Sequence, residues 1–162
     1  MTNRYGVQLL KELILAHKNL KEVDKPVVAK LCDKLSITQD HGYINEYFRE
    51  QVDAEATGLY LKSKYSEILA KLQGLVDQHK AGKSVELGAR DDEGLKWTKP
   101  SLENYMRGTD ARYVALMELV RESERLLSML RGLDDIINNR DYKLKELSVN
   151  YRREMKSDSN DR

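Results

Sequence analysis

The chain has 162 residues, a length typical of one domain, with 34% charged and 7% aromatic residues. Its formal net charge of +1 excludes a global field that attracts nucleic acid or membrane, so any such binding depends on locally concentrated charge. No apolar run approaches membrane-spanning length and the N-terminus has no signal-peptide pattern, so we expect a cytoplasmic protein with no membrane partner.

Residues 1–40 are predicted to contain one or two short helices. Apolar residues recur at helical spacing on one face of residues 5–20, which predicts the first. Asp24 is a residue type that caps helices, and Pro26 is tolerated in a first helical turn. A second helix is therefore predicted over residues 27–35.

A long helix is predicted over residues 43–79, where apolar residues recur at intervals of three and four. Glycines and Pro100 interrupt residues 81–100, which form the one clear non-helical stretch. Two short apolar segments within it, residues 85–87 and 95–97, predict either a β-hairpin or an extended loop. Ser101 or Thr109 is expected to cap the helix that follows.

Residues 109–155 are predicted to form one long helix, because they contain no proline and an apolar heptad repeat. A repeat of this length is typical of a coiled-coil seam that needs a partner. Arg140 is a cation at a seam position, and we expect it to pair with Asp134, Asp135 or an acid of a partner. The residues predicted to mediate oligomerisation are Leu126, Leu130, Leu133, Ile137, Arg140, Leu144, Leu147 and Tyr151.

These patterns together predict an all-α fold. Its main part is a long antiparallel helical hairpin or coiled coil with a loop or small β-hairpin at its tip. One or two short helices precede it. We expect residues 1–40 to form the short helices and residues 41–162 to form the hairpin.

Catalytic and metal-binding patterns are absent from the sequence. It contains no P-loop, no dinucleotide-binding glycine motif, no CxxC and no HExxH. His17, His41 and His79 lie in separate segments without metal-ligand spacing, and Asp91-Asp92 has no supporting ligands. Cys32 is the single cysteine, which excludes an internal disulfide and indicates a reducing compartment. We therefore expect no enzyme, no cofactor and no metal site.

Basic residues in the middle of the chain predict a surface for single-stranded nucleic acid. Phosphates bind lysine and arginine, while any base can stack on the indole of Trp97, the only tryptophan. Two alternatives remain open: that Lys62 and Lys64 form ordinary ion pairs with a neighbouring helix, and that Trp97 covers the helical core. The candidate DNA-binding residues are Lys62, Lys64, Lys83, Arg90, Lys96, Trp97 and Lys99.

Three features over residues 43–155 resemble the UvsY-like family of phage recombination mediators. The first is Leu61-Lys62-Ser63-Lys64 on a long helix, and the second is a glycine-rich tip. The third is the C-terminal run Leu133-Asp134-Asp135-Ile136-Ile137-Asn138-Asn139-Arg140, followed by Leu144, Leu147 and Arg152. Residues 1–40 have no counterpart in this resemblance.

The resemblance implies a small homo-oligomeric protein that binds single-stranded DNA in recombination and repair, in the host cytoplasm if it is a phage protein. Such proteins help to load a RecA-like recombinase onto strands covered by single-strand-binding protein. Lys62 and Lys64 match the family's basic pair, although lysine replaces the favoured arginine at the second position. The competing hypotheses are a structural scaffold without nucleic-acid affinity, and an adapter whose acidic residues 40–55 bind a protein partner.

Overall fold

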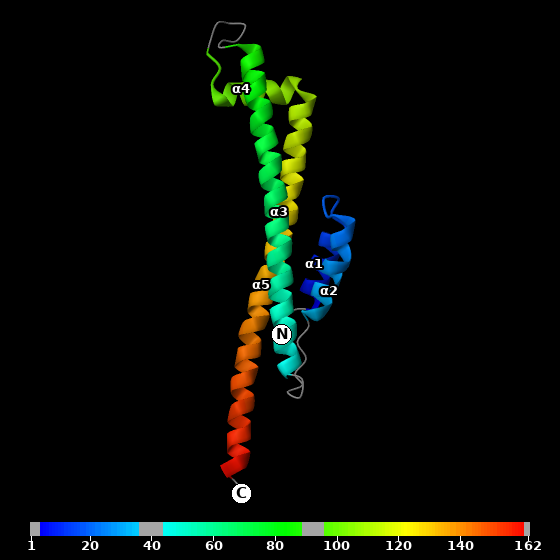
Figure 1. The fold of residues 1–162 in the computed structure, drawn as a ribbon, viewed down its shortest axis with the longest axis vertical. Helices are drawn as coiled ribbons and strands as arrows, with labels where there is room; N and C mark the ends of the chain where they lie inside the picture. Colours follow the sequence, from blue (N-terminus) through cyan, green and yellow to red (C-terminus); the bar gives the residue numbers. More distant parts are fainter. Residues whose placement is uncertain (1–3, 36–43, 89–95, 161–162) are drawn as a thin grey trace. The chain divides into compact units, whose positions relative to one another are not determined.

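The computed structural model describes residues 4–35, 44–88 and 96–160, and in these ranges every regular element is a helix (Figure 1). The predicted all-α class is therefore confirmed, with long helices packing against each other. In chain order the elements are α1 (Arg4–Leu15), the 3₁₀ helix η1 (Glu22–Asp24), α2 (Lys25–Lys34), α3 (Ile44–Leu87), α4 (Lys99–Thr109) and α5 (Ala111–Asn160).

The ends of α3 and α4 follow from capping residues. Gly88 follows α3 with a φ of 80°, a left-handed conformation that glycine adopts without strain and that commonly ends a helix. Thr98 and Ser101 form a reciprocal capping box at the start of α4, and a proline lies in its first turn.

Asp110 separates α4 from α5. Its backbone is extended, with φ −110° and ψ 96°, so the helical path is interrupted at this one residue. Its carboxylate Oδ1 accepts a hydrogen bond from the backbone N–H of Tyr113 at 2.9 Å, which caps the N-terminus of α5. The Asp110 side chain therefore contributes directly to the junction between the two helices.

Several sequence-based boundaries were wrong. Residues 85–87 form the last turn of α3 and not a β-strand, so the alternative of a β-hairpin is excluded there. Thr98 and Asp110 cap the two following helices, in place of Ser101 and Thr109. The first helix ends at Leu15 and not at residue 20. Residues 89–95, which include most of the predicted tip, lie outside the described residues.

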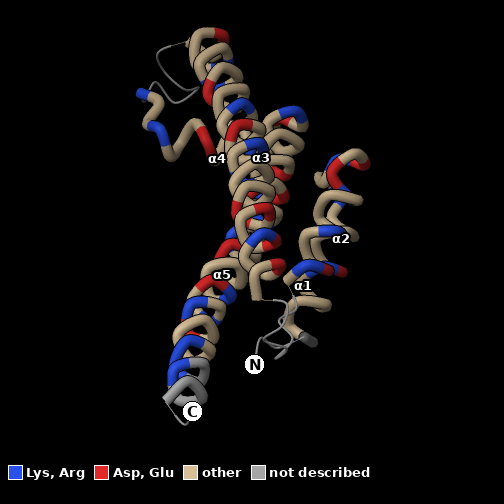
Figure 2. Tube along the Cα trace, turned by 60° about the horizontal axis from the view of Figure 1, so that its bottom comes forward, with Lys and Arg blue, Asp and Glu red and all other residues tan. Residues whose placement is uncertain are grey.

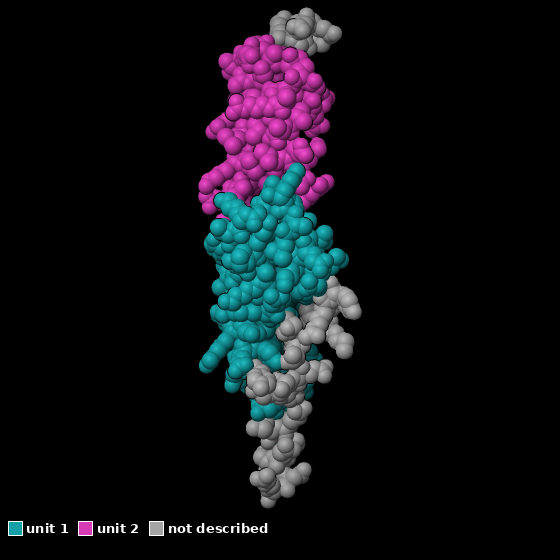
Figure 3. Space-filling model, turned by 90° about the vertical axis from the view of Figure 1, so that its right-hand side faces the viewer, with its two compact units in different colours: residues 1–63, 126–162 teal, residues 64–125 magenta. Residues whose placement is uncertain are grey.

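The chain divides into two compact units (Figure 3). Unit 1 comprises residues 1–63 and 126–162, and unit 2 comprises residues 64–125. Both α3 and α5 contribute to each unit. These units follow spatial contacts, and the predicted division into residues 1–40 and 41–162 stays a prediction.

In unit 1, the first part of α3 packs against the second part of α5 through paired side chains. Gln51 Nε2 donates a hydrogen bond to the backbone carbonyl of Ile137 at 2.9 Å. Further along α3, Lys62 forms a partly buried ion pair with Asp134. Residues later in α3 contact residues earlier in α5, so within this unit the two helices run in opposite directions.

Six of the eight residues predicted to mediate oligomerisation are buried in unit 1 by the chain's own packing, and Leu147 and Tyr151 are partly buried. Leu126 and Leu144 are both 0% exposed. Since these side chains are already covered in a single chain, the argument that their apolar seam needs a sister copy no longer holds. Homo-oligomerisation stays a prediction.

Gly58 marks a close approach between α3 and α5 in unit 1. A Cβ atom placed there would lie 2.8 Å from Ile137 Cδ1 and 3.2 Å from Asp134 Oδ1. Because Ile137 is 2% exposed, its methyl group has little room to move.

Gly58→Ala is therefore expected to lower the free energy of unfolding by about 1 kcal/mol, because overpacking outweighs the gain in helix propensity. Gly74→Ala is the matched control within the same helix, since a Cβ there meets nothing within 4 Å. It should raise stability by about 0.5–1 kcal/mol. Urea denaturation followed by circular dichroism measures both, and equal stabilisation by the two substitutions would refute the close approach.

Unit 2 has its own hydrophobic core at the junction of α3, α4 and α5. Val76, Met106, Tyr113 and Val120 are buried there, and partly buried leucines of all three helices pack against them. Lys80 on α3 bonds Glu103 on α4 at 2.7 Å, and its ammonium lies 5.8 Å from the centre of the Tyr113 ring. This core fixes the positions of the polar side chains described next.

Candidate nucleic-acid interface

The two lysines of the Leu61-Lys62-Ser63-Lys64 motif have partners within the chain. Lys62 forms the ion pair with Asp134. Lys64 also takes part in an interaction within the protein. For Lys62 the structure therefore favours the alternative of an ordinary ion pair with a neighbouring helix.

The basic residues before and at the start of α4, in unit 2, are more accessible. Lys96 and Lys99 are exposed, and neither forms an ion pair with another described residue. Trp97 lies between them and is partly buried, with its ring centroid 5.3 Å from that of Tyr105 and the ring planes tilted by 58°. Tyr105 is itself 39% exposed, so an aromatic pair lies beside two accessible cations.

The indole N–H of Trp97 is buried and has no hydrogen-bond partner among the described residues. A buried donor without an acceptor is unfavourable by about 1–3 kcal/mol. The sequence left open whether Trp97 covers the core or stacks on a base. In the structure its ring packs on Tyr105 of α4, while the neighbouring lysines remain accessible.

A cleft of about 450 Å³ lies between the end of α3 and the start of α5 in unit 2. Its polar lining consists of Gln78, His79, Lys83 and Glu86 from α3, and Arg112 from α5. Arg112 is exposed and forms no ion pair with another described residue. The structure thus brings Lys83 together with two groups, Arg112 and His79, that no motif in the sequence placed near it.

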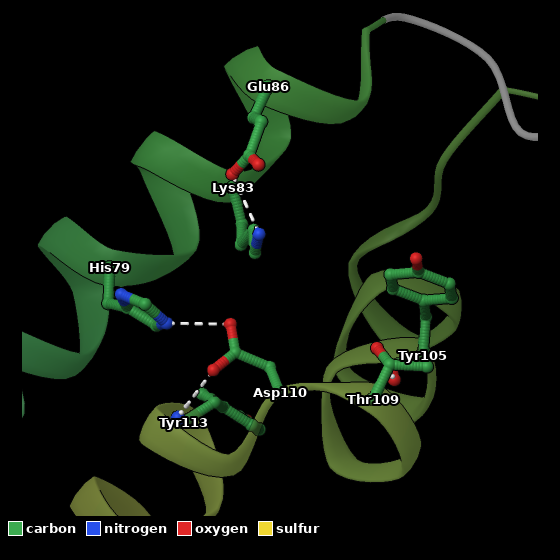
Figure 4. Close-up of polar contacts among 7 residues, drawn as sticks. All are labelled: His79, Lys83, Glu86, Tyr105, Thr109, Asp110 and Tyr113. Carbon is green, nitrogen blue, oxygen red and sulfur yellow. Dashed lines mark hydrogen bonds and ion pairs between the residues drawn. The ribbon is translucent and has the colours of Figure 1, made fainter.

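His79, which lines this cleft, and Asp110 point toward one another (Figure 4). His79 Nε2 lies 2.7 Å from Asp110 Oδ2, while Oδ1 accepts from the backbone of Tyr113. The Tyr113 N–H is the main cause that holds the pKa of Asp110 below its usual range, and the His79 contact acts in the same direction. Asp110 is therefore a carboxylate at neutral pH.

Lys83 forms a hydrogen-bonded ion pair with Glu86 one turn along α3, with 2.7 Å between Nζ and Oε2. This contact raises the pKa of Lys83, and the nearby charge of Asp110 and the hydroxyl of Tyr105 contribute less. Lys83 is thus fully charged at neutral pH. Its side chain is 28% exposed and that of Glu86 is 66% exposed, so water reaches both partners.

Further basic residues gather along the C-terminal part of α5 in unit 1 (Figure 2). Arg152, Arg153 and Lys156 are exposed, whereas Lys145 bonds Asp141 at 2.6 Å. These cations are equally consistent with a solvated helix face and with a second phosphate-binding surface. Arg90, the remaining candidate, lies outside the described residues.

Comparison of the chain with protein families, with curated proteins and with solved structures finds no match in any of the three. The resemblance to UvsY-like mediators therefore stays a prediction.

Within the described ranges, no helix combines the length and the apolarity needed to span a bilayer. Among the same residues, no group of three or more His, Cys, Asp or Glu side chains is placed to hold a metal ion.

Sequence reasoning missed Tyr105 and Arg112 because neither lies in a recognisable motif. For His79 the sequence indicated only a lack of metal-ligand spacing. The available signal was the spacing of Tyr105 from the capping residues of α4, which places it on the same side of that helix as Ser101 and Trp97. The position of Arg112 beside Lys83 depends on the break at Asp110, which no periodicity predicts.

Proposed function

We propose that this protein binds single-stranded DNA without sequence preference, through a surface in unit 2. The observation that supports this most is the combination of exposed Lys96 and Lys99 with the Trp97–Tyr105 aromatic pair. Cations attract the backbone of a strand, and an accessible aromatic ring stacks on any base. These are the two contacts that sequence-independent binding of a single strand needs.

The wider function we propose is that of a recombination mediator, as the resemblance implies. In that role the protein helps to load a RecA-like recombinase onto strands covered by single-strand-binding protein, and it performs no catalysis of its own. The long helices α3 and α5 act as an antiparallel hairpin that carries the DNA-binding surface. Assembly of several copies multiplies modest contacts, which compensates for the net charge of only +1.

Lys96→Gln combined with Lys99→Gln is expected to weaken binding to a labelled oligothymidylate about tenfold at low salt, because two phosphate contacts are lost. The slope of log affinity against log salt should fall by about 1.4, at about 0.7 per phosphate on a single strand. Fluorescence anisotropy at several salt concentrations measures both quantities. Duplex DNA of equal length should bind more weakly, since its bases cannot stack on the aromatic pair.

Lys71→Gln combined with Arg121→Gln is the matched control, because both residues are exposed cations of unit 2. It removes the same charge and should change affinity less than twofold. If both double variants weaken binding equally, the protein attracts DNA by its general positive charge, and the proposed surface around Lys96 and Lys99 is refuted. If the unaltered protein binds no oligonucleotide at any salt concentration, the proposal is wrong and the structural-scaffold hypothesis is favoured.

A further inference from the structure

The cleft of unit 2 combines two cations from different helices around an open space. Lys83 belongs to the last turns of α3, and Arg112 to the first turn of α5. Gln78 adds a neutral side-chain amide that can donate hydrogen bonds. Between these groups Gly82 contributes no side chain, and a Cβ placed there would meet nothing within 4 Å.

The charges that face this space come from both helices. Lys83 and Arg112 are positive and Glu86 is negative, whereas the negative charge of Asp110 is engaged by His79 and by the backbone of Tyr113. The backbone of Arg112 hydrogen-bonds Asp110, whereas its guanidinium forms no ion pair with another described residue. The formal charges of the two cations and two carboxylates balance, so the group left for an anion is the Arg112 guanidinium.

The ion pair between Glu86 and Lys83 is weak. The pair is three residues apart on one helix, and the Glu86 side chain is 66% exposed. Pairs of this kind, open to water and on one helix, contribute little to stability. A phosphate group that contacts Lys83 and Arg112 together makes two charge-assisted contacts, so it can displace the Glu86 carboxylate.

We propose that this cleft is a subsite for one backbone phosphate of the bound strand, in which Lys83 and Arg112 hold the phosphate and Glu86 competes with it for Lys83. The inference rests on the proposed function and names a second contact of the same unit. Leu75 and Leu116 form apolar walls of the cleft, and in this proposal they face the sugar of the nucleotide whose phosphate is bound. Glu86 thus limits affinity in the unaltered protein.

The test is the affinity for a labelled oligothymidylate, measured by anisotropy at low salt. Lys83→Gln and Arg112→Gln should each weaken binding about three- to tenfold and reduce the salt slope by about 0.7. Glu86→Gln should strengthen binding about two- to threefold, because it removes the competing carboxylate. A gain of affinity is informative, since misfolding does not produce one.

The chain offers a matched control pair on the same helix and in the same unit. Lys71 bonds Glu67 at 2.6 Å, and both side chains are exposed. Lys71→Gln and Glu67→Gln make the same changes of charge outside the cleft, and each should alter affinity less than twofold. If Glu86→Gln behaves like Glu67→Gln, or if both cleft cations behave like Lys71, the subsite is refuted while DNA binding stands.

A second experiment distinguishes binding of a phosphate group of the strand from binding of a free phosphate ion. Inorganic phosphate is added to the isotope-labelled protein, and its binding is followed through the NMR signals of Lys83 and Arg112. Competition between inorganic phosphate and the oligonucleotide at these signals supports the subsite. Shifts with phosphate in a protein that binds no oligonucleotide would overturn both proposals and identify a free-anion site instead.

Discussion

Glu50→Ala is expected to lower the free energy of unfolding by about 2–3 kcal/mol, although Glu50 is a partly exposed residue. Its Oε2 accepts a hydrogen bond at 3.0 Å from Nη2 of Arg140, whose side chain is 0% exposed. Nε and Nη1 of Arg140 are also buried and have no partner among the described residues. Removal of the carboxylate therefore leaves a buried guanidinium with no anion, which is strongly unfavourable.

Arg140→Met should have a much smaller effect, within about 1 kcal/mol and of either sign. The substitution removes a buried charge, fills a similar volume, and leaves Glu50 with 39% of its side chain in water. The double variant Glu50→Ala/Arg140→Met should then be about as stable as Arg140→Met alone. Urea denaturation of the four proteins gives the coupling energy, which should be about 2 kcal/mol.

The control for this cycle is Asp53→Ala, which breaks the pair between Lys34 and a 68% exposed Asp53 in the same unit. It should cost no more than about 0.5 kcal/mol. Strict additivity of the Glu50 and Arg140 substitutions would contradict the buried pair.

This pair illustrates how far the sequence leads. The heptad repeat indicates that Arg140 occupies a core position, and the structure confirms its burial. The expected partners were Asp134, Asp135 or another chain, whereas the observed partner is Glu50, ninety residues away. A periodic pattern shows which face of a helix is buried, but it does not define the register between two helices. That register decides which acid faces Arg140.

The first part of α3 shows the same limit of sequence patterns. Gln51 and Gly58 interrupt the apolar pattern of residues 43–79, so periodicity alone does not predict close packing there. In the structure Gln51 is 2% exposed and hydrogen-bonds the backbone of α5, and Gly58 allows the close approach. Polar and small residues at a helix contact are stabilised by partners that lie far away in the sequence, which local periodicity does not reveal.

The candidate DNA-binding residues divide in the same way. Residue type alone identifies cations near Trp97, and Lys96 and Lys99 are indeed accessible. Type does not show which cations are already paired, so Lys62 appeared equivalent to them although it bonds Asp134. Residues 85–87 were ambiguous because three residues are too few to distinguish a strand from the end of a helix.

Asp110→Ala is expected to lower the free energy of unfolding by about 2 kcal/mol. The substitution removes the N-cap of α5, usually about 1 kcal/mol, and also the contact with His79, about 1 kcal/mol more. Asp110→Asn should cost less, because asparagine caps helices as well as aspartate does, while the negative charge beside His79 is lost. Thermal and urea unfolding at neutral pH rank the two variants.

The stability difference between the protein and Asp110→Asn should depend on pH with a defined sign. The folded state holds the pKa of Asp110 below its unfolded value of about 3.9, so the carboxylate contributes stability that is fully present above that value. This contribution is lost as the pH falls through the folded pKa. The two proteins should therefore differ most above about pH 4 and converge below it. A difference that stays constant from pH 7 to pH 2 would show that the charge of Asp110 does not stabilise the α4–α5 junction.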